Sequence, residues 1–373
     1  MTRRAVIIGG GISGAVTAMA LAKAGIEPVI HEAYPEGAAD AGAFLTIMDN
    51  GMDALRAVDA LEPVVANSFP AHGVEVFGVT GEQVGERVFS RLGVTSPRTL
   101  TRAGLYRVLH GEAARRGIAF EHGKRLVSAE TTAHGVEARF EDGSTAHGDI
   151  LIGADGLHSV VRKLIDPDAP SPRYTGLNIV YGYTRSADIP AAPAIYRMIQ
   201  GKHAFFGYTT APDGQTYWFS RIPGPERSRG ELAAVTPAEW RSLAAEAFAD
   251  DEPPSAGIIA ATGDEVHGGL AYDVPTLPIW STPEMVLVGD AAHAASPAAG
   301  QGASMALEDS VVLAQCLRDL PDAAEAFKTY EGLRRERVER LVAVSAGQRD
   351  AGTERNWLYD HHIDWDAPIT ASA

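Results

Sequence analysis

The stretch Ala5-Val-Ile-Ile-Gly9-Gly-Gly11-Ile-Ser13-Gly14 decides the fold of this chain. Ala5–Ile8 is a short apolar run typical of a buried strand, and the alanine-rich stretch Ile12–Ala24 predicts a helix that ends at Gly25. Pro28–Ala33 predicts a second strand. A strand, a glycine turn, a helix and a second strand are the beginning of a parallel α/β sheet.

The glycine spacing in this turn suits a dinucleotide. In Gly9-x-Gly11-x-x-Gly14, the glycines allow a tight turn and let a pyrophosphate approach the helix N-terminus. Glu32 lies 18 residues beyond Gly14, where it can accept hydrogen bonds from a ribose diol. We therefore expect Gly9, Gly11, Ser13, Gly14 and Glu32 to bind a dinucleotide. The alternative is a purely structural glycine turn.

Length and composition describe an ordinary globular protein. The 373 residues allow two or three domains, and 45% hydrophobic with 21% charged residues exclude a disordered or fibrous chain. The 48 acidic residues exceed the 32 basic ones, which gives a net charge of −16. A field of this sign repels phosphate backbones and anionic lipid, so we expect neither nucleic acid nor a membrane surface as a partner.

Cysteine usage bounds the compartment and the chemistry. Cys316 is the single cysteine, which excludes an intramolecular disulfide, a Cys-x-x-Cys redox pair and a thiolate metal cluster. We expect a cytoplasmic protein without a metal site. No stretch reaches the roughly 18 to 20 continuous apolar residues that a membrane helix needs.

Two kinds of segment follow the first motif. Thr101 can cap a helix that runs to about Arg116, and alternation over 123–149 suggests antiparallel strands before a buried strand at Ile150–Ala154. The 46 residues from Tyr174 to Phe219 hold 10 of the 27 aromatic residues, which indicates a meander of strands in a second domain. A buried strand at Met285–Gly289 and two helices, over 303–317 and 324 to about 344, complete the chain.

This pattern predicts an α/β fold with a discontinuous Rossmann-like domain and an inserted domain. We assign residues 1–72, 98–172 and 276–350 to a FAD-binding domain. Residues 73–97 and 173–275 are assigned to a mainly antiparallel β-sheet domain that binds the substrate. C-terminal helices close the first domain, and residues 351–373 form a C-terminal tail.

Two further motifs each follow a predicted buried strand. The first is Asp155-Gly-Leu-His-Ser-Val-Val-Arg162, and the second is Gly289-Asp-Ala-Ala-His-x3-Pro-x2-Gly-Gln-Gly302. Together with the amino-terminal glycine turn and Arg98–Leu105, they resemble the three fingerprints of the single-component, class A flavoprotein monooxygenases, the aromatic-hydroxylase family. The resemblance extends in order and spacing from Arg4 to about Arg337.

The resemblance implies roles for single residues. Asp290 would hydrogen-bond the ribityl chain of FAD, Arg102 would reach the ribityl or pyrophosphate region, and Asp155 would lie behind the pyrophosphate. Gly300, Gly302 and Ala303 would open a helix whose positive end faces the flavin, with Pro297 as a rigid wall. Asp290 could instead be a helix N-cap, and a capping serine and a surface arginine would explain Ser159 and Arg162 equally well. Ser304 stands where many relatives carry asparagine, which a hydroxyl can replace as a hydrogen-bonding group.

The substrate pocket is less legible in the sequence. Strand alternation places Tyr181 with Tyr183, Phe206 with Tyr208, and Tyr217 with Phe219 on common faces, while Trp218 points the other way. One of these faces should cover the flavin. We name His203, Tyr217, Phe206 and Pro297 as candidate catalytic or pocket residues. Core packing for the aromatic residues, and a structural role for His203 and His293, are the alternatives.

The resemblance also implies a reaction. NAD(P)H reduces FAD, and the reduced flavin reacts with O2 to give a C4a-hydroperoxide that hydroxylates an electron-rich phenol, indole or polyketide-like aromatic. Family precedent favours NADPH over NADH as the transient co-substrate, and we expect a monomer or homodimer in secondary metabolism. A flavin disulfide reductase would need two cysteines, and this chain has one. A halogenase would need a lysine between Lys23 and Lys124, where the sequence has none. An epoxidase, a flavin dehydrogenase or reductase, and a cyclase remain alternatives.

Overall fold

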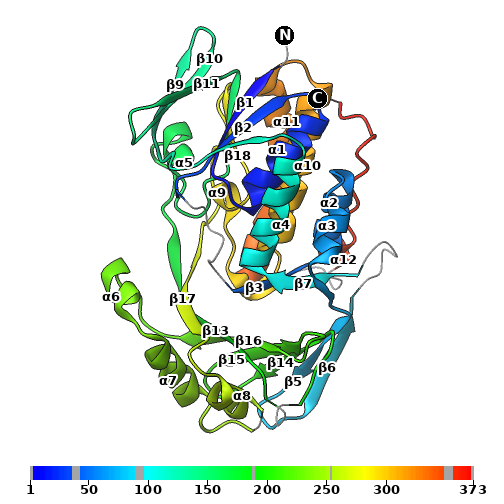
Figure 1. Cartoon of the computed structure of the whole chain (residues 1–373), viewed down its shortest axis with the longest axis vertical. Helices are drawn as coiled ribbons and strands as arrows, with labels where there is room; N and C mark the ends of the chain where they lie inside the picture. The colour runs from blue at the N-terminus through cyan, green and yellow to red at the C-terminus, as the bar shows by residue number, and fades with distance from the viewer. Residues whose placement is uncertain are drawn as a thin grey trace.

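A computed structural model describes residues 3–35, 43–89, 96–186, 190–252, 254–347 and 356–370. Two layered units lie one above the other in Figure 1, a helix-covered parallel sheet and a large mixed sheet. The predicted fold class, with its parallel sheet, antiparallel sheets and C-terminal helices, is confirmed. In the described part of the chain, no helix is long and apolar enough to cross a membrane.

The parallel sheet has the strand order β18-β12-β1-β2-β8. Its members are β1 (Arg4–Ile8), β2 (Glu27–His31), β8 (Ala119–Glu121), β12 (Ile150–Gly153) and β18 (Met285–Leu287). All neighbouring pairs are parallel. The central strands are almost wholly buried because both faces of the sheet are covered. One face carries α1 (Ile12–Lys23), α4 (Arg102–Arg115), α10 (Gly302–Asp319) and α11 (Ala323–Ser345).

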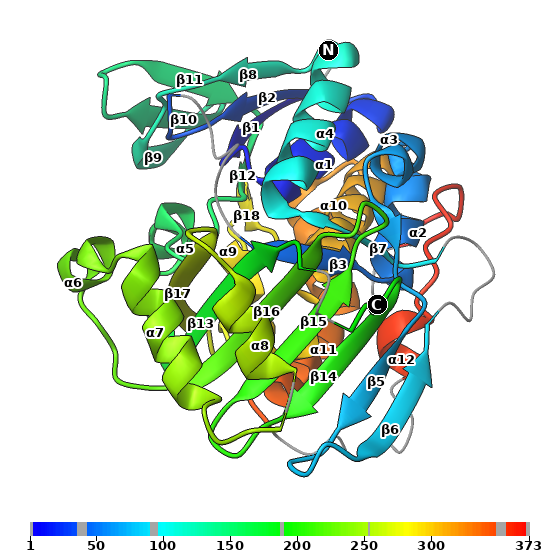
Figure 2. The same ribbon diagram turned by 60° about the horizontal axis from the view of Figure 1, so that its bottom comes forward.

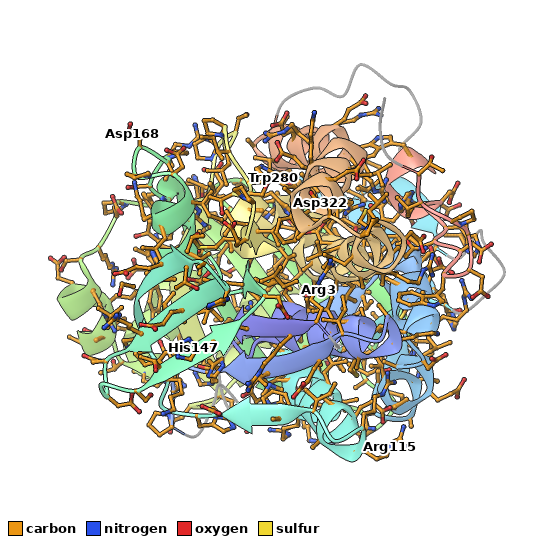
Figure 3. The ribbon with its side chains drawn as sticks, turned by 90° about the horizontal axis from the view of Figure 1, so that it is seen from above. Arg3, Arg115, His147, Asp168, Trp280 and Asp322 are labelled. Atoms are coloured by element: carbon orange, nitrogen blue, oxygen red, sulfur yellow. The ribbon has the colours of Figure 1, made fainter. Side chains whose placement is uncertain are left out.

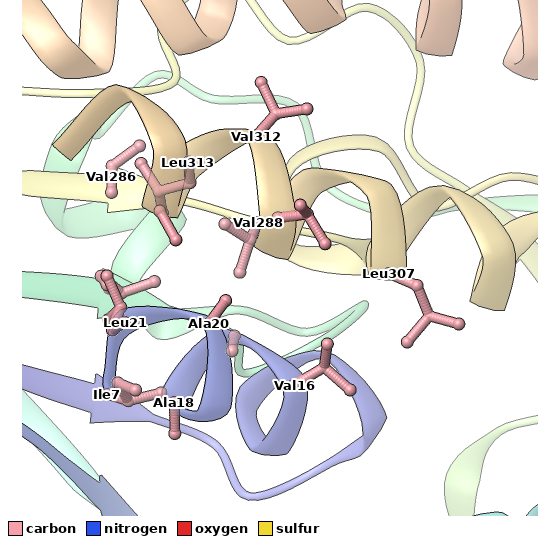
Figure 4. Packing of buried hydrophobic residues seen from close by; sticks show 14 of the residues in the cluster. Ile7, Val16, Ala18, Ala20, Leu21, Val286, Val288, Leu307, Val312 and Leu313 are labelled. Atoms are coloured by element: carbon pink, nitrogen blue, oxygen red, sulfur yellow. The ribbon is translucent and has the colours of Figure 1, made fainter. Parts of the chain in front are cut away.

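Small residues let α1 lie close to the sheet and to α10. Figure 4 shows Val16, Ala20 and Leu21 of α1 turned toward Leu307 and Leu313 of α10. All five side chains are fully buried. Each large buried side chain contributes about 1.5–3 kcal/mol relative to exposure, so this contact fixes α10, and with it the loop that precedes it, against the glycine turn.

A small sheet, β9 (Leu126–Thr132), β10 (Gly135–Phe140) and β11 (Thr145–Gly148), covers the other face of the parallel sheet. These are the antiparallel strands expected over 123–149. Seen from above in Figure 3, charged residues such as Arg115 and Asp168 lie at the rim, while Trp280 lies among helices. Trp280 is 1% exposed.

The second unit is built on a seven-stranded sheet of order β17-β13-β16-β15-β14-β5-β6. Its members are β5 (Gly73–Phe77), β6 (Gln83–Val88), β13 (Arg173–Thr184), β14 (Ile195–Gln200), β15 (Phe205–Thr210), β16 (Thr216–Pro223) and β17 (Val266–Asp273). β14, β15 and β16 form a meander, and β13 pairs with β16. Its outer face carries α7 (Pro237–Ala247) and α8 (Ser255–Ala261), which lie in front of the sheet in Figure 2, while α6 (Arg229–Ala234) lies to one side of it.

The remaining elements are short. They are β3 (Phe44–Ile47), β4 (Phe69–Pro70), β7 (Arg98–Thr101), α2 (Asp49–Ala57), α3 (Leu61–Ala66), α5 (Val160–Ile165), α9 (Asp290–His293), the 3-10 turn η1 (Pro297–Ala299) and α12 (Asn356–Tyr359). The predicted cap at Thr101 is present, because the Gly104 N–H donates to Thr101 Oγ1 at 3.0 Å. Within the predicted tail, residues 356–370 pack on the body of the protein: Leu358 and Ile363 are buried, and the Ile363 N–H donates to Asp53.

Candidate active site

The glycine turn packs against the end of β12. Gly9 has φ +101°, and a Cβ there would lie 2.5 Å from the Ala154 oxygen. A Cβ on Gly14 would lie 1.9 Å from the Gly9 oxygen. Only glycine fits at these two positions. By contrast, a Cβ on Gly11 would meet no atom within 4 Å, so Gly11 borders open space where a phosphate group can approach the backbone.

Glu32 is buried beside this turn and is held by main-chain donors. Its Oε2 accepts from the Gly10 N–H at 2.7 Å, and its Oε1 accepts from the Tyr34 N–H at 2.9 Å. The His110 ring hydrogen-bonds the Gly10 carbonyl, and burial lowers the pKa of His110. The backbone of the turn is therefore fixed by side chains from two other elements.

Asp155 organises the start of α5. It accepts hydrogen bonds from the Ser159 hydroxyl at 2.5 Å and from the N–H groups of Val160 and Val161 at 2.7 and 3.1 Å. Burial raises the pKa of Asp155, and these donors oppose the rise. Ser159 is the N-cap, since it accepts from the Arg162 N–H at 2.9 Å. The alternative reading of Ser159 as a capping serine therefore matches its contacts.

Arg162 is not a surface arginine, which corrects the alternative given for it. It is 2% exposed, and its guanidinium donates to the carbonyls of Ala291 at 2.8 Å, Leu157 at 2.9 Å and Asp290 at 3.1 Å. Charge-assisted bonds to main-chain carbonyls are strong when buried. Arg162 thus fastens the second motif to the third. In the sequence, the only indication of this role was the position of Arg162 within the second motif.

The third motif approaches both the glycine turn and the start of α10. A Cβ on Gly289, which has φ +59°, would lie 3.0 Å from Ser13 Oγ. Gly289 occupies the N-cap position of α9, so Asp290 is the first helical residue and not the cap. A Cβ on Gly302 would lie 3.9 Å from Asp290 Oδ1, which places this carboxylate beside the opening turn of α10.

Two buried polar atoms of these loops lack a hydrogen-bond partner among the described residues. They are Ser13 Oγ in the glycine turn and Gln301 Nε2 before α10. Gln301 is 1% exposed, and its Oε1 accepts from Asn50 Nδ2 at 3.1 Å. The first N–H groups of α10, from Gly302 and Ala303, have no partner within the helix. A phosphate and the polar edge of a flavin would satisfy such donors, so the residues present fit FAD. Gln301 was missed in the sequence analysis although it stands between two named glycines.

Other residues of the third motif lie as follows. Gly300 adopts a left-handed conformation with φ +62° at the end of η1, and Pro297 is exposed at its beginning. His293 is 5% exposed, and its Nε2 lies 2.5 Å from Asp309 Oδ2. This partner matches the structural alternative given for His293. Ser304 accepts from the Met48 N–H at 3.1 Å.

An aromatic surface lies opposite the loops. We call Tyr181, Tyr183, Tyr196, Phe205, Tyr217 and Phe219 the aromatic face of the seven-stranded sheet. Phe44 of β3 contacts it, with ring centroids 5.4 Å from Tyr217, 6.0 Å from Phe219 and 6.2 Å from Tyr183. Burial raises the pKa of Tyr183 and Tyr217, and that of Tyr196 to about 12. These phenols therefore stay neutral at neutral pH and offer hydrogen bonds without charge.

Arg102 and Tyr217 border the junction of the two units. The Arg102 N–H donates to the Ala43 carbonyl at 2.8 Å. Burial raises the pKa of Tyr181, and the positive charge of Arg102 opposes this rise, so the two side chains lie within electrostatic range. A cavity of about 620 Å³ between α3, α4 and β7 reaches Tyr217.

The structure separates Phe206 from the aromatic face, which corrects its choice as a candidate catalytic or pocket residue. Phe206 is fully buried on the outer face, 5.6 Å from the Trp218 ring and 5.3 Å from the Phe248 ring. Strand alternation is the reason, because Phe206 pairs with Ser220 while Tyr217 and Phe219 point to the opposite side. His203 is exposed in the turn between β14 and β15. In the described ranges, no set of three His, Cys, Asp or Glu residues could hold a metal ion.

The comparisons with known proteins each match most of this chain. The family model described as FAD binding domain matches residues 2–345. The aurachin C monooxygenase/isomerase of Stigmatella aurantiaca is 30% identical over 91% of this chain and 87% of its own length. The 3-amino-4-hydroxybenzoate 2-monooxygenase PtmB3 of Streptomyces platensis is 31% identical, over 94% and 88%. The crystal structure of Klebsiella pneumoniae HpxO complexed with FAD and uric acid has a TM-score of 0.83 at 28% identity and covers 92% of this chain and 87% of that chain.

Proposed function

Because the chain belongs to the FAD-binding-domain family of class A flavin monooxygenases, we propose that it hydroxylates an electron-rich aromatic or heteroaromatic small molecule. It is an FAD-dependent NAD(P)H monooxygenase, as the resemblance implied. The proposal concerns the finer statement, hydroxylation of a phenol, indole or polyketide-like ring. The relatives named above act on an aminohydroxybenzoate and on aurachin C, and HpxO binds uric acid.

One observation carries the proposal. Three loops far apart in sequence lie together, since Gly9 packs against Ala154 and Gly289 against Ser13. These loops hold two buried polar atoms without a partner among the described residues, and the second unit adds a sheet face made of aromatic side chains. Polar donors on one side and aromatic rings on the other are what a flavin and a planar organic substrate need. The cytoplasmic location and the monomer or homodimer belong to the same proposal.

The residues that would hold FAD come from all three loops. Gly11 and Ser13 would hold the pyrophosphate, Glu32 the adenosine ribose and Asp290 the ribityl chain. Bound FAD supplies hydride acceptance from the nicotinamide and the activation of O2. Gln301 Nε2 and the first N–H groups of α10 would stabilise negative charge at the pyrimidine edge of the ring, because the helix dipole is positive there.

The remaining residues would position the substrate and exclude water. The aromatic face would pack against a planar ring and exclude water from the reacting region. Excluding water limits the unproductive release of hydrogen peroxide. Tyr217 and Pro297 stay in the proposal as walls of this pocket. Its tyrosine hydroxyls can donate hydrogen bonds to a substrate oxygen. His203, in the turn between β14 and β15, stays a candidate proton carrier. Phe206 is no longer a candidate, because it is buried in the outer core.

Substrate-dependent oxygen uptake by the FAD-loaded protein tests the proposal. Phenols, indoles and polyketide enols are supplied with NADPH or NADH, and the product is analysed after reaction under ¹⁸O2. We expect one substrate class to stimulate oxygen uptake and to gain one labelled oxygen atom. Oxidation of NAD(P)H that continues unchanged without oxygen would instead identify a dehydrogenase or reductase.

A further inference from the structure

Arg221 lies on the same side of β16 as Tyr217 and Phe219. The strand alternates strictly, with Thr216, Trp218, Ser220 and Ile222 buried toward the outer helices. Arg221 is opposite Phe205 on β15 and Ile179 on β13. The side chain therefore belongs to the surface that the sheet turns toward the FAD loops, away from α7 and α8 in Figure 2.

The guanidinium of Arg221 is desolvated, and none of the described acidic residues forms an ion pair with it. It lies over the Phe205 ring, with Cζ 3.9 Å from the ring centroid. Its Nε is buried and has no hydrogen-bond partner among the described residues, and burial lowers the pKa of Arg221. Two other arginines of the sheet are paired: Arg173 with Asp273 at 2.8 Å and Arg197 with Glu75 at 3.0 Å.

A partly buried cation without a partner costs free energy, so an arginine at this position calls for a compensating group. The Phe205 ring covers the flat face of the guanidinium through a cation–π contact, and the N–H groups along the edge of the guanidinium are left to bind another group. That edge matches a carboxylate or another pair of anionic oxygens, which an arginine can bind through two parallel hydrogen bonds. The neighbouring Phe219 ring, with its centroid 6.1 Å from that of Phe205, offers a surface for the ring that bears the anion.

We propose that Arg221 binds an anionic oxygen group of the substrate and thereby selects aromatic acids or oxyanions over neutral aromatics. The inference rests on the proposed function, because it places the substrate on the aromatic face. Arg221 then determines specificity: its bond to the anion fixes the orientation of the ring and so which carbon faces the cofactor.

The test measures binding rather than turnover. FAD-loaded wild-type protein is titrated with matched pairs, 3-amino-4-hydroxybenzoate against 2-aminophenol and 6-hydroxynicotinate against 2-hydroxypyridine, and the flavin absorbance gives Kd. 4-Nitrophenol at a pH where it is ionised, compared with 4-nitroanisole, separates a ring oxyanion from a carboxylate. We expect the anionic member to bind more tightly, and Arg221→Met to weaken only that member by about 10- to 100-fold, the range for hydrogen bonds to charged groups.

Two controls distinguish this role from a structural one. Arg229→Met removes the same charge from an exposed position in α6 and should leave every Kd unchanged. The ligand-free Arg221→Met protein should unfold at the same or a higher temperature, since it loses an unpaired buried cation, whereas a stabilising stack on Phe205 predicts a lower temperature. Arg221→Lys should retain part of the preference.

The proposal is overturned if no anionic compound binds at millimolar concentration, or if Arg221→Met weakens anionic and neutral compounds equally. Failure here is separable from failure of the proposed function. A neutral aromatic that stimulates oxygen uptake and gains a labelled oxygen leaves the monooxygenase intact and removes the role of Arg221. Selective anion binding without any oxygen transfer does the reverse.

Discussion

At the scale of single residues, two different physical reasons explain why glycine stands at positions 14 and 11 of the first motif. Gly14 is required by packing, since its Cβ would overlap the Gly9 carbonyl. Gly11 is not required by any contact within the described protein, because its Cβ would point into open space. A residue that the fold does not need as glycine, at the centre of the motif, is best explained by a ligand that needs close access to the backbone.

This difference gives a matched pair of variants. Gly14→Ala should lower the free energy of unfolding by about 1–3 kcal/mol through overpacking and should also lose FAD. Gly11→Ala should unfold at nearly the wild-type denaturant concentration, yet bind FAD more weakly because its methyl group occupies the path of the pyrophosphate. Urea unfolding of the apoproteins and FAD titration separate the two effects. Equal loss of stability in both variants would contradict the assignment of Gly11 to the cofactor.

At the scale of elements, a buried polar network joins α10 to α11. Arg334 of α11 is 1% exposed and pairs with Glu308 and, at 2.7 Å, with Asp309, both fully buried in α10. Arg337 reaches Glu308 at 2.8 Å. Asn50 donates to Glu308 at 2.5 Å and to Gln301 at 3.1 Å, so the network continues to the loop proposed to hold the flavin.

Substitution of Arg334 should show how much the charge balance of this network contributes to the free energy of unfolding. Arg334→Met leaves two buried carboxylates short of a counter-ion, and the free energy of unfolding should fall by about 3–5 kcal/mol. Arg115→Met is the control, because Arg115 is 71% exposed in its ion pair with Glu112 and should contribute less than about 1 kcal/mol. The comparison is made by urea denaturation of both variants. A small loss in Arg334→Met would mean that Arg337 and water compensate the carboxylates.

At the scale of the whole molecule, the same network predicts how stability responds to acid. Burial alone would raise the pKa of Glu308, but Arg334 and Arg337 outweigh it and lower the pKa to about 2, from an ordinary value of 4.5. His293 and Arg334 likewise hold the pKa of Asp309 well below its usual range against the effect of burial.

A carboxyl group with a lower pKa in the folded protein binds fewer protons there than in the unfolded chain. Its stabilising contribution is therefore complete above about pH 5 and is lost as the pH falls from about 4.5 toward about 2. Urea unfolding at a series of pH values should show this decline, and the Arg334→Met protein should show a shallower one. A wild-type free energy of unfolding that stays constant across this range would contradict the prediction.

Much of the fold could be predicted because its signals are local. The glycine turn, the two strands that flank it and the helix after it lie within about 30 residues, and Thr101 and Gly25 end or begin helices through contacts with their own neighbours. The three motifs could be recognised for the same reason, since each is a strand followed at once by a loop. Their order along the chain resembles that of the class A flavin monooxygenases, and the family match over residues 2–345 confirms this relationship.

The tertiary structure alone decided which way the second sheet faces and which side chains have partners. Strand alternation groups Phe206 apart from Tyr217, but only the tertiary contacts show that Phe206 lies in a core under the helices and that Tyr217 faces Phe44 of β3. Arg162, Arg221 and Gln301 show the same limit. Arg162 is paired by a residue more than 100 positions away, whereas Arg221 and Gln301 each have a buried atom without a partner among the described residues. A local sequence pattern cannot predict either outcome, because both depend on which distant residues the fold brings near.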